Sequence, residues 1–113
     1  MNNVTDKEVI DTQILKEYTP ELINRLITMF QEQAPQSIAK LKGYATEQNA
    51  VQIGKEAHYL KGSSAALGGT QLTAICKELQ LKGEQGDLSD IDALLEQLER
   101  SYTQSLAILQ RLC

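Results

Sequence analysis

The sequence predicts an all-α fold, namely an antiparallel four-helix up-and-down bundle with a short extra N-terminal helix, in a single domain over residues 1–113. Aromatic residues make up only 4% of the chain, Trp is absent, and Ala, Leu, Gln, Glu and Lys are abundant. This composition favours helix over strand. Apolar residues recur every three or four positions, which is the helical period, and no alternating strand pattern competes. Five helices are expected, at about 6–16, 20–46, 50–67, 71–82 and 90–112.

The first two helices carry start signals. Thr5 and Glu8 have the T-x-x-E spacing of a capping box, in which a hydroxyl and a carboxylate satisfy free N–H groups. Thr19 places a capping hydroxyl before Pro20, a residue suited to the first helical turn. The apolar stripe of the long helix continues past Pro35, so this proline is expected to kink the helix rather than end it.

The remaining helices are delimited by capping residues and glycines. Asn49, with Gln52 three residues later, indicates the start of the third helix, and Gly68 follows its end. Thr70 is expected to cap the fourth helix, which glycines at 83 and 86 should end. Ser89 is expected to cap the last helix. Short connections between amphipathic helices of this kind are typical of an antiparallel bundle.

Charge and composition exclude several classes of function. Eleven basic against fifteen acidic residues give a net charge of −4, so neither a nucleic acid nor an anionic membrane is an expected partner. No apolar stretch is long enough to span a membrane and the first residues lack secretory-signal features, which predicts a cytoplasmic location. Cys76 and Cys113 lie far apart, and there is one histidine. These are too few for a metal site, so we expect no metal and no cofactor of the chain's own.

The single histidine, His58, lies in the middle of the third helix. At about 100° per residue, the apolar stripe from Ile53 to Leu67 points in one direction, and His58 projects about 140° away from it. The ring is therefore expected to face solvent or a partner. A solvated surface histidine with no further role is the ordinary alternative.

The neighbours of His58 favour a role in chemistry. Gly54 and Gly62 flank it at i−4 and i+4, and both are expected to leave the ring uncovered. Because Gly inside a helix costs about 1 kcal/mol relative to Ala, Gly62 favours the close approach of a macromolecule. Lys61, one turn after the histidine, offers a compact cation suited to phosphate. This set of residues suits a nucleophilic histidine that is phosphorylated and then donates the group, since a neutral imidazole has a ring lone pair available to attack.

The segment from His58 to Gly68, HYLKGSSAALG, resembles the H-x-L-K-G-S-[SA]-x-x-[IL]-G signature of histidine-containing phosphotransfer (HPt) domains of bacterial two-component phosphorelays. The resemblance covers almost the whole chain and implies a helical bundle in which His58 carries the phosphoryl group on Nε2. It also implies that Lys61 helps to hold the phosphate and that Gly62 makes room for the partner. Members of the family often have a glutamine 22 positions after the histidine that contacts the imidazole, and Gln80 stands there.

For three polar residues near this segment the sequence allows two interpretations. The hydroxyls of Ser63 and Ser64 either serve the site or bond back to helix carbonyls and the neighbouring helix. Lys77, one turn before Gln80, either adds to the basic field around His58 or is simply solvated. Residues 54–82 carry two acids and four bases, so the middle of the chain is locally basic.

The resemblance implies a phosphorelay intermediate and not an enzyme with kinase activity of its own. The expected partners are receiver domains: the chain accepts a phosphoryl group from the aspartate of a hybrid histidine kinase and passes it to that of a response regulator. Mg²⁺ is expected on the receiver, whose acidic pocket a basic surface would favour. Exposed apolar residues of the first helix and of the start of the long one are expected to form the docking patch. We expect a monomer, and Met1 and the ending at Cys113 favour a free-standing protein over a domain excised from a kinase.

Other functions fit the sequence less well. A helical-bundle adaptor that binds a signalling partner without being phosphorylated is the alternative, although the chain retains His58 with Lys61 and Gly62. A histidine kinase would need a nucleotide-binding domain, and the glycines from Gly62 onward lack the phosphate-binding G-x-x-x-x-G-K-[ST] arrangement. A Ser/His hydrolase is disfavoured because Ser63 and Ser64, five and six residues along the same helix, do not reach His58.

Overall fold

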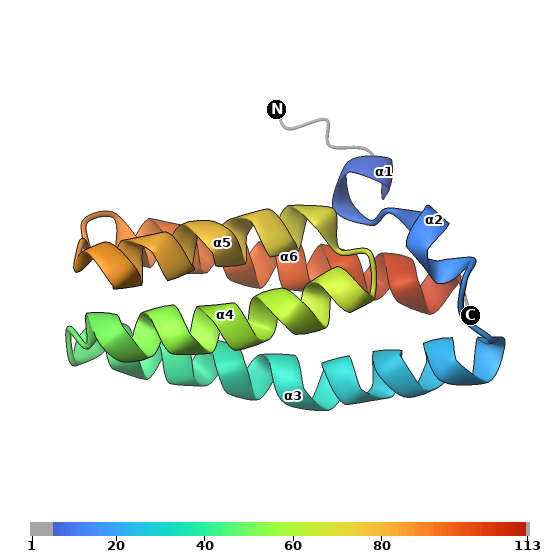
Figure 1. Cartoon of the computed structure of the whole chain (residues 1–113), viewed down its shortest axis with the longest axis horizontal. Coiled ribbons are helices and arrows are strands. Elements are labelled where there is room, and N and C mark those ends of the chain that lie inside the picture. The colour runs from blue at the N-terminus through green and yellow to red at the C-terminus, as the bar shows by residue number, and fades with distance from the viewer. Residues whose placement is uncertain (1–5, 113) are drawn as a thin grey trace.

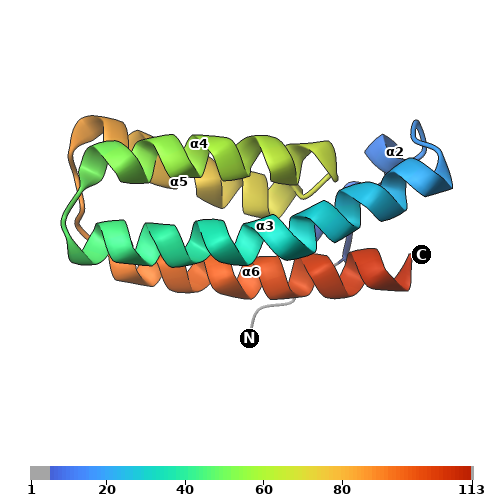
Figure 2. The same cartoon turned by 90° about the horizontal axis from the view of Figure 1, so that it is seen from below.

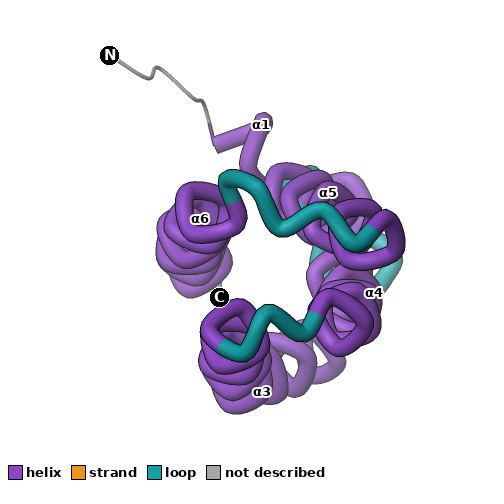
Figure 3. Tube along the Cα trace, turned by 90° about the vertical axis from the view of Figure 1, so that its left-hand side faces the viewer, coloured by secondary structure: helices purple, strands orange, loops and turns teal. Residues whose placement is uncertain are grey.

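The computed structural model describes residues 6–112, which form a bundle of four long helices with two short helices at one end (Figure 1). The helices in chain order are α1 (Asp6–Val9), α2 (Thr12–Leu15), α3 (Pro20–Thr46), α4 (Ala50–Ala66), α5 (Thr70–Gln85) and α6 (Ile91–Arg111). Seen from the end, α3, α4, α5 and α6 surround a common core, and loops join α3 to α4 and α5 to α6 (Figure 3). The all-α bundle predicted from the sequence is confirmed. None of the described helices combines the length and the apolar character needed to cross a membrane.

The core lies between the four long helices, and each contributes an apolar stripe to it. The residues of the α4 stripe from Ile53 to Leu67 are buried, as the helical period predicts. Large side chains with almost no solvent exposure come from all four helices, namely Leu41, Ile53, Leu60, Leu72, Leu79, Leu98 and Leu109. The most extensive contact between two elements is that of α4 with α5, which places these two helices together as a tight hairpin.

The starts of α3 and α4 follow the sequence signals. The Thr19 side chain accepts a hydrogen bond from the Leu22 backbone N–H at 3.1 Å, and the Asn49 side chain accepts one from Gln52 at 3.3 Å. Pro35 lies inside α3, which continues to Thr46. Figure 2 shows that the two halves of α3 run in different directions, in agreement with a kink rather than a break at proline.

The N-terminal helix expected over 6–16 is wrong in one respect, because the chain breaks into α1 and α2 at Asp11. The Asp11 backbone N–H donates to the Gly68 carbonyl at 2.6 Å instead of to a carbonyl four residues earlier. Its backbone is extended, and its side chain caps α2 by accepting from the Gln13 N–H at 3.0 Å. A tertiary hydrogen bond to the α4–α5 turn therefore replaces a helical one. Thr5, the first residue of the expected capping box, lies outside the described residues.

Two further start signals are corrected. Thr70 does not cap α5 but is its first residue, and its hydroxyl donates to the Glu8 carbonyl at 3.1 Å, which ties α5 to the end of α1. Gly83 does not end α5, because it packs against α4, and the helix continues to Gln85, after which Gly86 caps it with a φ of 70°. Ser89 does not cap α6, which begins after a left-handed residue, Asp90.

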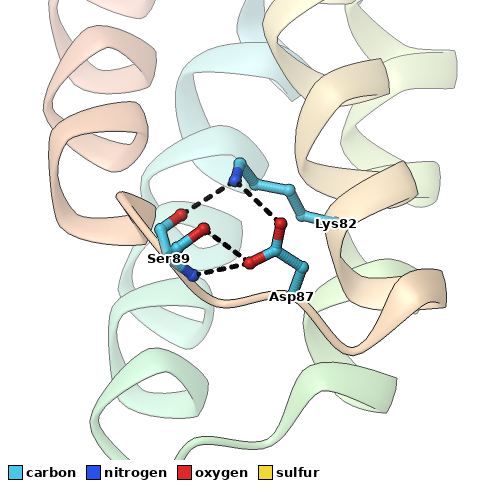
Figure 4. A network of polar contacts seen from close by, with 3 residues as sticks. All are labelled: Lys82, Asp87 and Ser89. Carbon is cyan, nitrogen blue, oxygen red and sulfur yellow. Dashed lines mark hydrogen bonds and ion pairs between the residues drawn. The ribbon is translucent and has the colours of Figure 1, made fainter.

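The loop between α5 and α6 instead uses Ser89 in a network with Asp87 and Lys82 (Figure 4). The Ser89 backbone N–H and hydroxyl both donate to Asp87 Oδ1, and Lys82 Nζ donates to the Ser89 carbonyl at 2.8 Å. The hydrogen bonds from Ser89, assisted by the positive charge of Lys82, lower the pKa of the Asp87 carboxyl from its ordinary value. The network holds the loop that returns the chain to the start of α6.

Candidate functional site

His58 lies on the exposed face of α4, with Ala57 and Leu60 buried on the opposite side. The helical period that buries the stripe from Ile53 to Leu67 also turns the imidazole outward, as the sequence predicts. None of the helices described for residues 6–112 covers the ring, so one face of α4 presents it to solvent. The position is suited to a side chain that must meet another molecule.

The imidazole is held by a side chain from the neighbouring helix. His58 Nδ1 lies 3.2 Å from Oε1 of Gln80 on α5. The amide group of Gln80 in turn donates from Nε2 to Glu84 Oε2 at 3.0 Å. Beside the ring is an open groove of about 510 Å³, lined by Val51, Gly54, Lys55, His58, Gln80, Gly83 and Glu84. The sequence brings His58 and Gln80 together across 22 residues, as the resemblance implied.

Two glycines allow α4 and α5 to approach each other closely at this point. A Cβ added to Gly83 would lie 2.5 Å from the Gly54 backbone nitrogen and 2.7 Å from the Ala50 carbonyl oxygen. Gly54 itself is buried, and its missing side chain faces the backbone of α5. The expectation that Gly54 shares the exposed face of His58 is therefore wrong, because Gly54 is buried against α5 at the edge of the groove. It serves helix packing.

Gly62, which the resemblance assigns to partner clearance, has open space around it. It is exposed on α4 one turn after His58, and a Cβ added there would meet no atom of the described part of the chain within 4 Å. Nothing inside the bundle requires glycine at this position. The conformational cost of Gly in a helix is therefore not explained by internal packing.

Basic residues lie on both sides of the histidine along α4. Lys61 follows His58 by one turn and is partly buried, while Lys55 precedes it by one turn and lines the groove. Lys61 also influences the interior: burial raises the pKa of the Cys76 thiol to about 12, and the positive charge of Lys61 opposes this effect. Lys77 is exposed on α5 and is not among the residues that line the groove.

The two serines of the motif bond to their own helix. Ser63 Oγ donates to the Tyr59 carbonyl at 3.4 Å, and the buried Ser64 Oγ lies 3.0 Å from the carbonyls of Leu60 and Lys61. Ser64 also contacts the Thr73 hydroxyl of α5 at 3.1 Å. Of the two interpretations, the structure therefore places both hydroxyls in helix and hairpin contacts.

Comparison with known proteins identifies the family. The family model for the Hpt domain matches residues 25–107. The chain belongs to the Hpt domain family. Over 60 residues it is 32% identical to the phosphorelay intermediate protein YPD1 of Candida albicans, a match that covers 53% of this chain and 33% of that protein. The chain thus spans about a third of the length of this curated relative.

The fold of this Hpt domain is also found in a solved structure. The crystal structure of histidine-containing phosphotransfer protein B (HptB) from Pseudomonas aeruginosa PAO1 matches with a TM-score of 0.85. The match covers 95% of each chain at 24% sequence identity, so the likeness concerns the fold.

Three residues beside the histidine of this Hpt domain were not singled out from the sequence. Val51, Lys55 and Glu84 all line the groove. Helical spacing could have indicated two of them. Lys55 precedes His58 by three residues and Glu84 follows Gln80 by four, which places each pair on one helix face. Val51 is 63% exposed, and its place beside the site depends on where α5 lies, which the sequence of α4 does not contain.

Proposed function

We propose that this Hpt domain is a phosphorelay intermediate. It accepts a phosphoryl group on His58 from the aspartate of a receiver domain, such as that of a hybrid sensor kinase, and passes it to the aspartate of a response regulator. It acts in the cytoplasm as a monomeric carrier without kinase activity of its own. Family membership supports the general role. The geometry supports it through the hydrogen bond that the imidazole makes with Gln80.

The observation that carries the proposal is the contact between His58 Nδ1 and Gln80 Oε1 on an otherwise exposed ring. An amide oxygen only accepts hydrogen bonds, so this contact favours the tautomer in which Nδ1 carries the ring proton and Nε2 keeps its lone pair. In that tautomer Nε2, the ring nitrogen that Gln80 does not contact, is available as a nucleophile.

The transfer follows from this state of the ring. The Nε2 lone pair attacks the phosphorus of the aspartyl phosphate, a P–N bond forms, the P–O bond to the aspartate breaks, and the carboxylate leaves. The reverse reaction delivers the group to the next receiver. Because phosphoryl transfer depends chiefly on positioning and charge stabilisation, Lys61 supplies a cation one turn from His58. Mg²⁺ belongs to the receiver domain in this proposal, beside its aspartate.

A docking surface borders His58 on the side of α3. Tyr59 is half exposed and donates from its hydroxyl to Gln33 Oε1 at 3.0 Å, and Met29, one turn before Gln33, is 43% exposed. Gly62 follows Tyr59 by three residues and leaves open space. We propose Met29, Tyr59 and Gly62 as the apolar contact for a receiver domain. The sequence predicted the patch on the first helix and the start of the long one; the proposed patch instead uses α3 and α4, and the end of α1 contacts the start of α5.

The experiment is incubation of the chain with a phosphorylated receiver domain and Mg²⁺, followed by a test for an acid-labile, base-stable label. Wild type should take up the label and His58→Gln should not, with unchanged helicity. Lys61→Ala should slow transfer or shorten the lifetime of the phosphohistidine, whereas the matched control Lys77→Ala should not. A His58→Gln variant that still incorporates phosphate refutes the proposal. Failure of several receivers to transfer phosphate to wild type would favour the adaptor that is never phosphorylated.

A further inference from the structure

Glu84 occupies a position beside the site that the proposed chemistry has not used. It lies on α5 one turn after Gln80, and both side chains line the groove next to His58. Glu84 Oε2 accepts a hydrogen bond from Gln80 Nε2 at 3.0 Å, and Gln80 Oε1 lies 3.2 Å from His58 Nδ1. Three side chains thus form a continuous chain of hydrogen bonds that ends at the imidazole.

Glu84 determines which group donates and which accepts in these hydrogen bonds. A carboxylate only accepts hydrogen bonds, whereas the two ends of an amide differ, one accepting and one donating. Glu84 therefore holds the NH₂ end of Gln80 toward itself and leaves the oxygen toward His58. The opposite amide orientation would place two oxygens face to face at Glu84. It would also offer an N–H to His58 Nδ1, which would then need to be unprotonated.

We propose that Glu84 is a positioning residue that selects the Nδ1–H tautomer of His58. This inference rests on the proposed phosphotransfer function, because the tautomer matters for an attack by Nε2. In the Nε2–H tautomer the nitrogen that faces the partner carries a proton and has no in-plane lone pair to attack phosphorus. Glu84 does not touch the phosphoryl group and acts through Gln80 alone. A purely structural role is the alternative, since Gln and Glu four residues apart can simply support a helix.

The test uses the fact that the chain contains one histidine, so that histidine labelled with ¹⁵N reports on His58 alone. The ¹⁵N chemical shifts of the ring are measured at mildly alkaline pH, where imidazoles are neutral and the shifts distinguish the two tautomers. Glu84→Gln is nearly isosteric and keeps a hydrogen-bonding group. Because its amide can accept or donate, it no longer fixes the orientation of the Gln80 amide. Glu78→Gln is the control, because it makes the same charge change at an exposed position of α5 that does not line the groove.

Wild type and Glu78→Gln should show the Nδ1–H tautomer, and Glu84→Gln should show a mixture. If both orientations of the Gln80 amide become equally available, about half of the rings hold the reactive tautomer, and the transfer rate falls about twofold. Glu84→Ala, which removes the acceptor, should shift the tautomer in the same direction. Circular dichroism should be unchanged in all variants, because Glu84 is exposed.

Two results would overturn the inference: a wild-type ring in the Nε2–H tautomer, or Glu84 variants with the tautomer ratio and transfer rate of wild type. Failure of the proposed function gives a different result. If the domain is not a phosphorelay intermediate, wild type takes up no phosphate from a receiver, while the tautomer ratio in Glu84→Gln still shows whether Glu84 positions the imidazole.

Discussion

Substitution of Gly62 by alanine should make the domain more stable and less active at the same time. A Cβ at Gly62 meets no atom within 4 Å, and the same is true of Gly43 in α3. Both residues lie near the C-terminal ends of their helices and are exposed. Ala is favoured over Gly inside a helix by about 1 kcal/mol. Gly62→Ala and Gly43→Ala should therefore each raise the free energy of unfolding by up to about 1 kcal/mol, which corresponds to roughly 4 °C in Tm.

Only Gly62→Ala should impair phosphotransfer. If the receiver domain packs against the bare helix surface at Gly62, an added methyl group costs about 1–3 kcal/mol in the complex, as overpacking does in protein interiors. Each 1.4 kcal/mol corresponds to a factor of ten, so kcat/KM for transfer should fall by between about fivefold and about a hundredfold. Gly43→Ala carries the same change in helix propensity and should transfer at the wild-type rate.

Urea unfolding followed by circular dichroism measures stability, and rapid-quench transfer from a phosphorylated receiver measures function. If Gly62→Ala transfers as fast as Gly43→Ala, the receiver does not pack against the bare helix surface at Gly62. If Gly62→Ala is less stable than wild type, its methyl group meets another atom within the bundle, and the space around Gly62 is not open.

Two further predictions concern stability. Gly83→Ala should lower the free energy of unfolding by about 1–2 kcal/mol, because its Cβ would lie 2.5 Å from the Gly54 nitrogen and overpacking outweighs the gain in helix propensity; stabilisation in a urea titration would contradict this. Asp87→Asn should destabilise the domain at neutral pH, because the folded state lowers the pKa of this carboxyl. That stabilisation is present above the ordinary pKa of about 3.9 and is lost as the pH falls through the lowered value, so the difference from wild type should vanish in acid. An equal difference at both pH values would show that the charge of Asp87 is not responsible.

Helical periodicity was sufficient to place His58 on the exposed face of its helix. The buried stripe of α4 fixes the direction of every side chain on that helix, so the outward position of His58 follows from the residues between Ile53 and Leu67 alone. The caps at Thr19 and Asn49 were also predictable, because a cap and its target lie within three residues of each other in the sequence.

Features that depend on a second helix were not predictable in this way. The break at Asp11 arises because its N–H reaches the Gly68 carbonyl, far away in sequence. Gly54 was assigned to the solvent side because the pattern of α4 does not reveal that Gly83 of α5 covers it. Gln80 was placed beside His58 through the family resemblance, since no periodicity links residues on two different helices.

The close approach of α4 and α5 connects the stability of the bundle to the chemistry of its histidine. His58 follows Gly54 by one turn on α4, and Gln80 precedes Gly83 by one turn on α5. The contact between the two glycines therefore sets the distance over which Gln80 must reach the imidazole. Because a hydrogen bond of 3.2 Å is already near the long end of the useful range, a small separation of the helices would break it. Gly83→Ala should thus lower the share of the proposed Nδ1–H tautomer, measured from the ¹⁵N shifts of the ring, as well as lower stability.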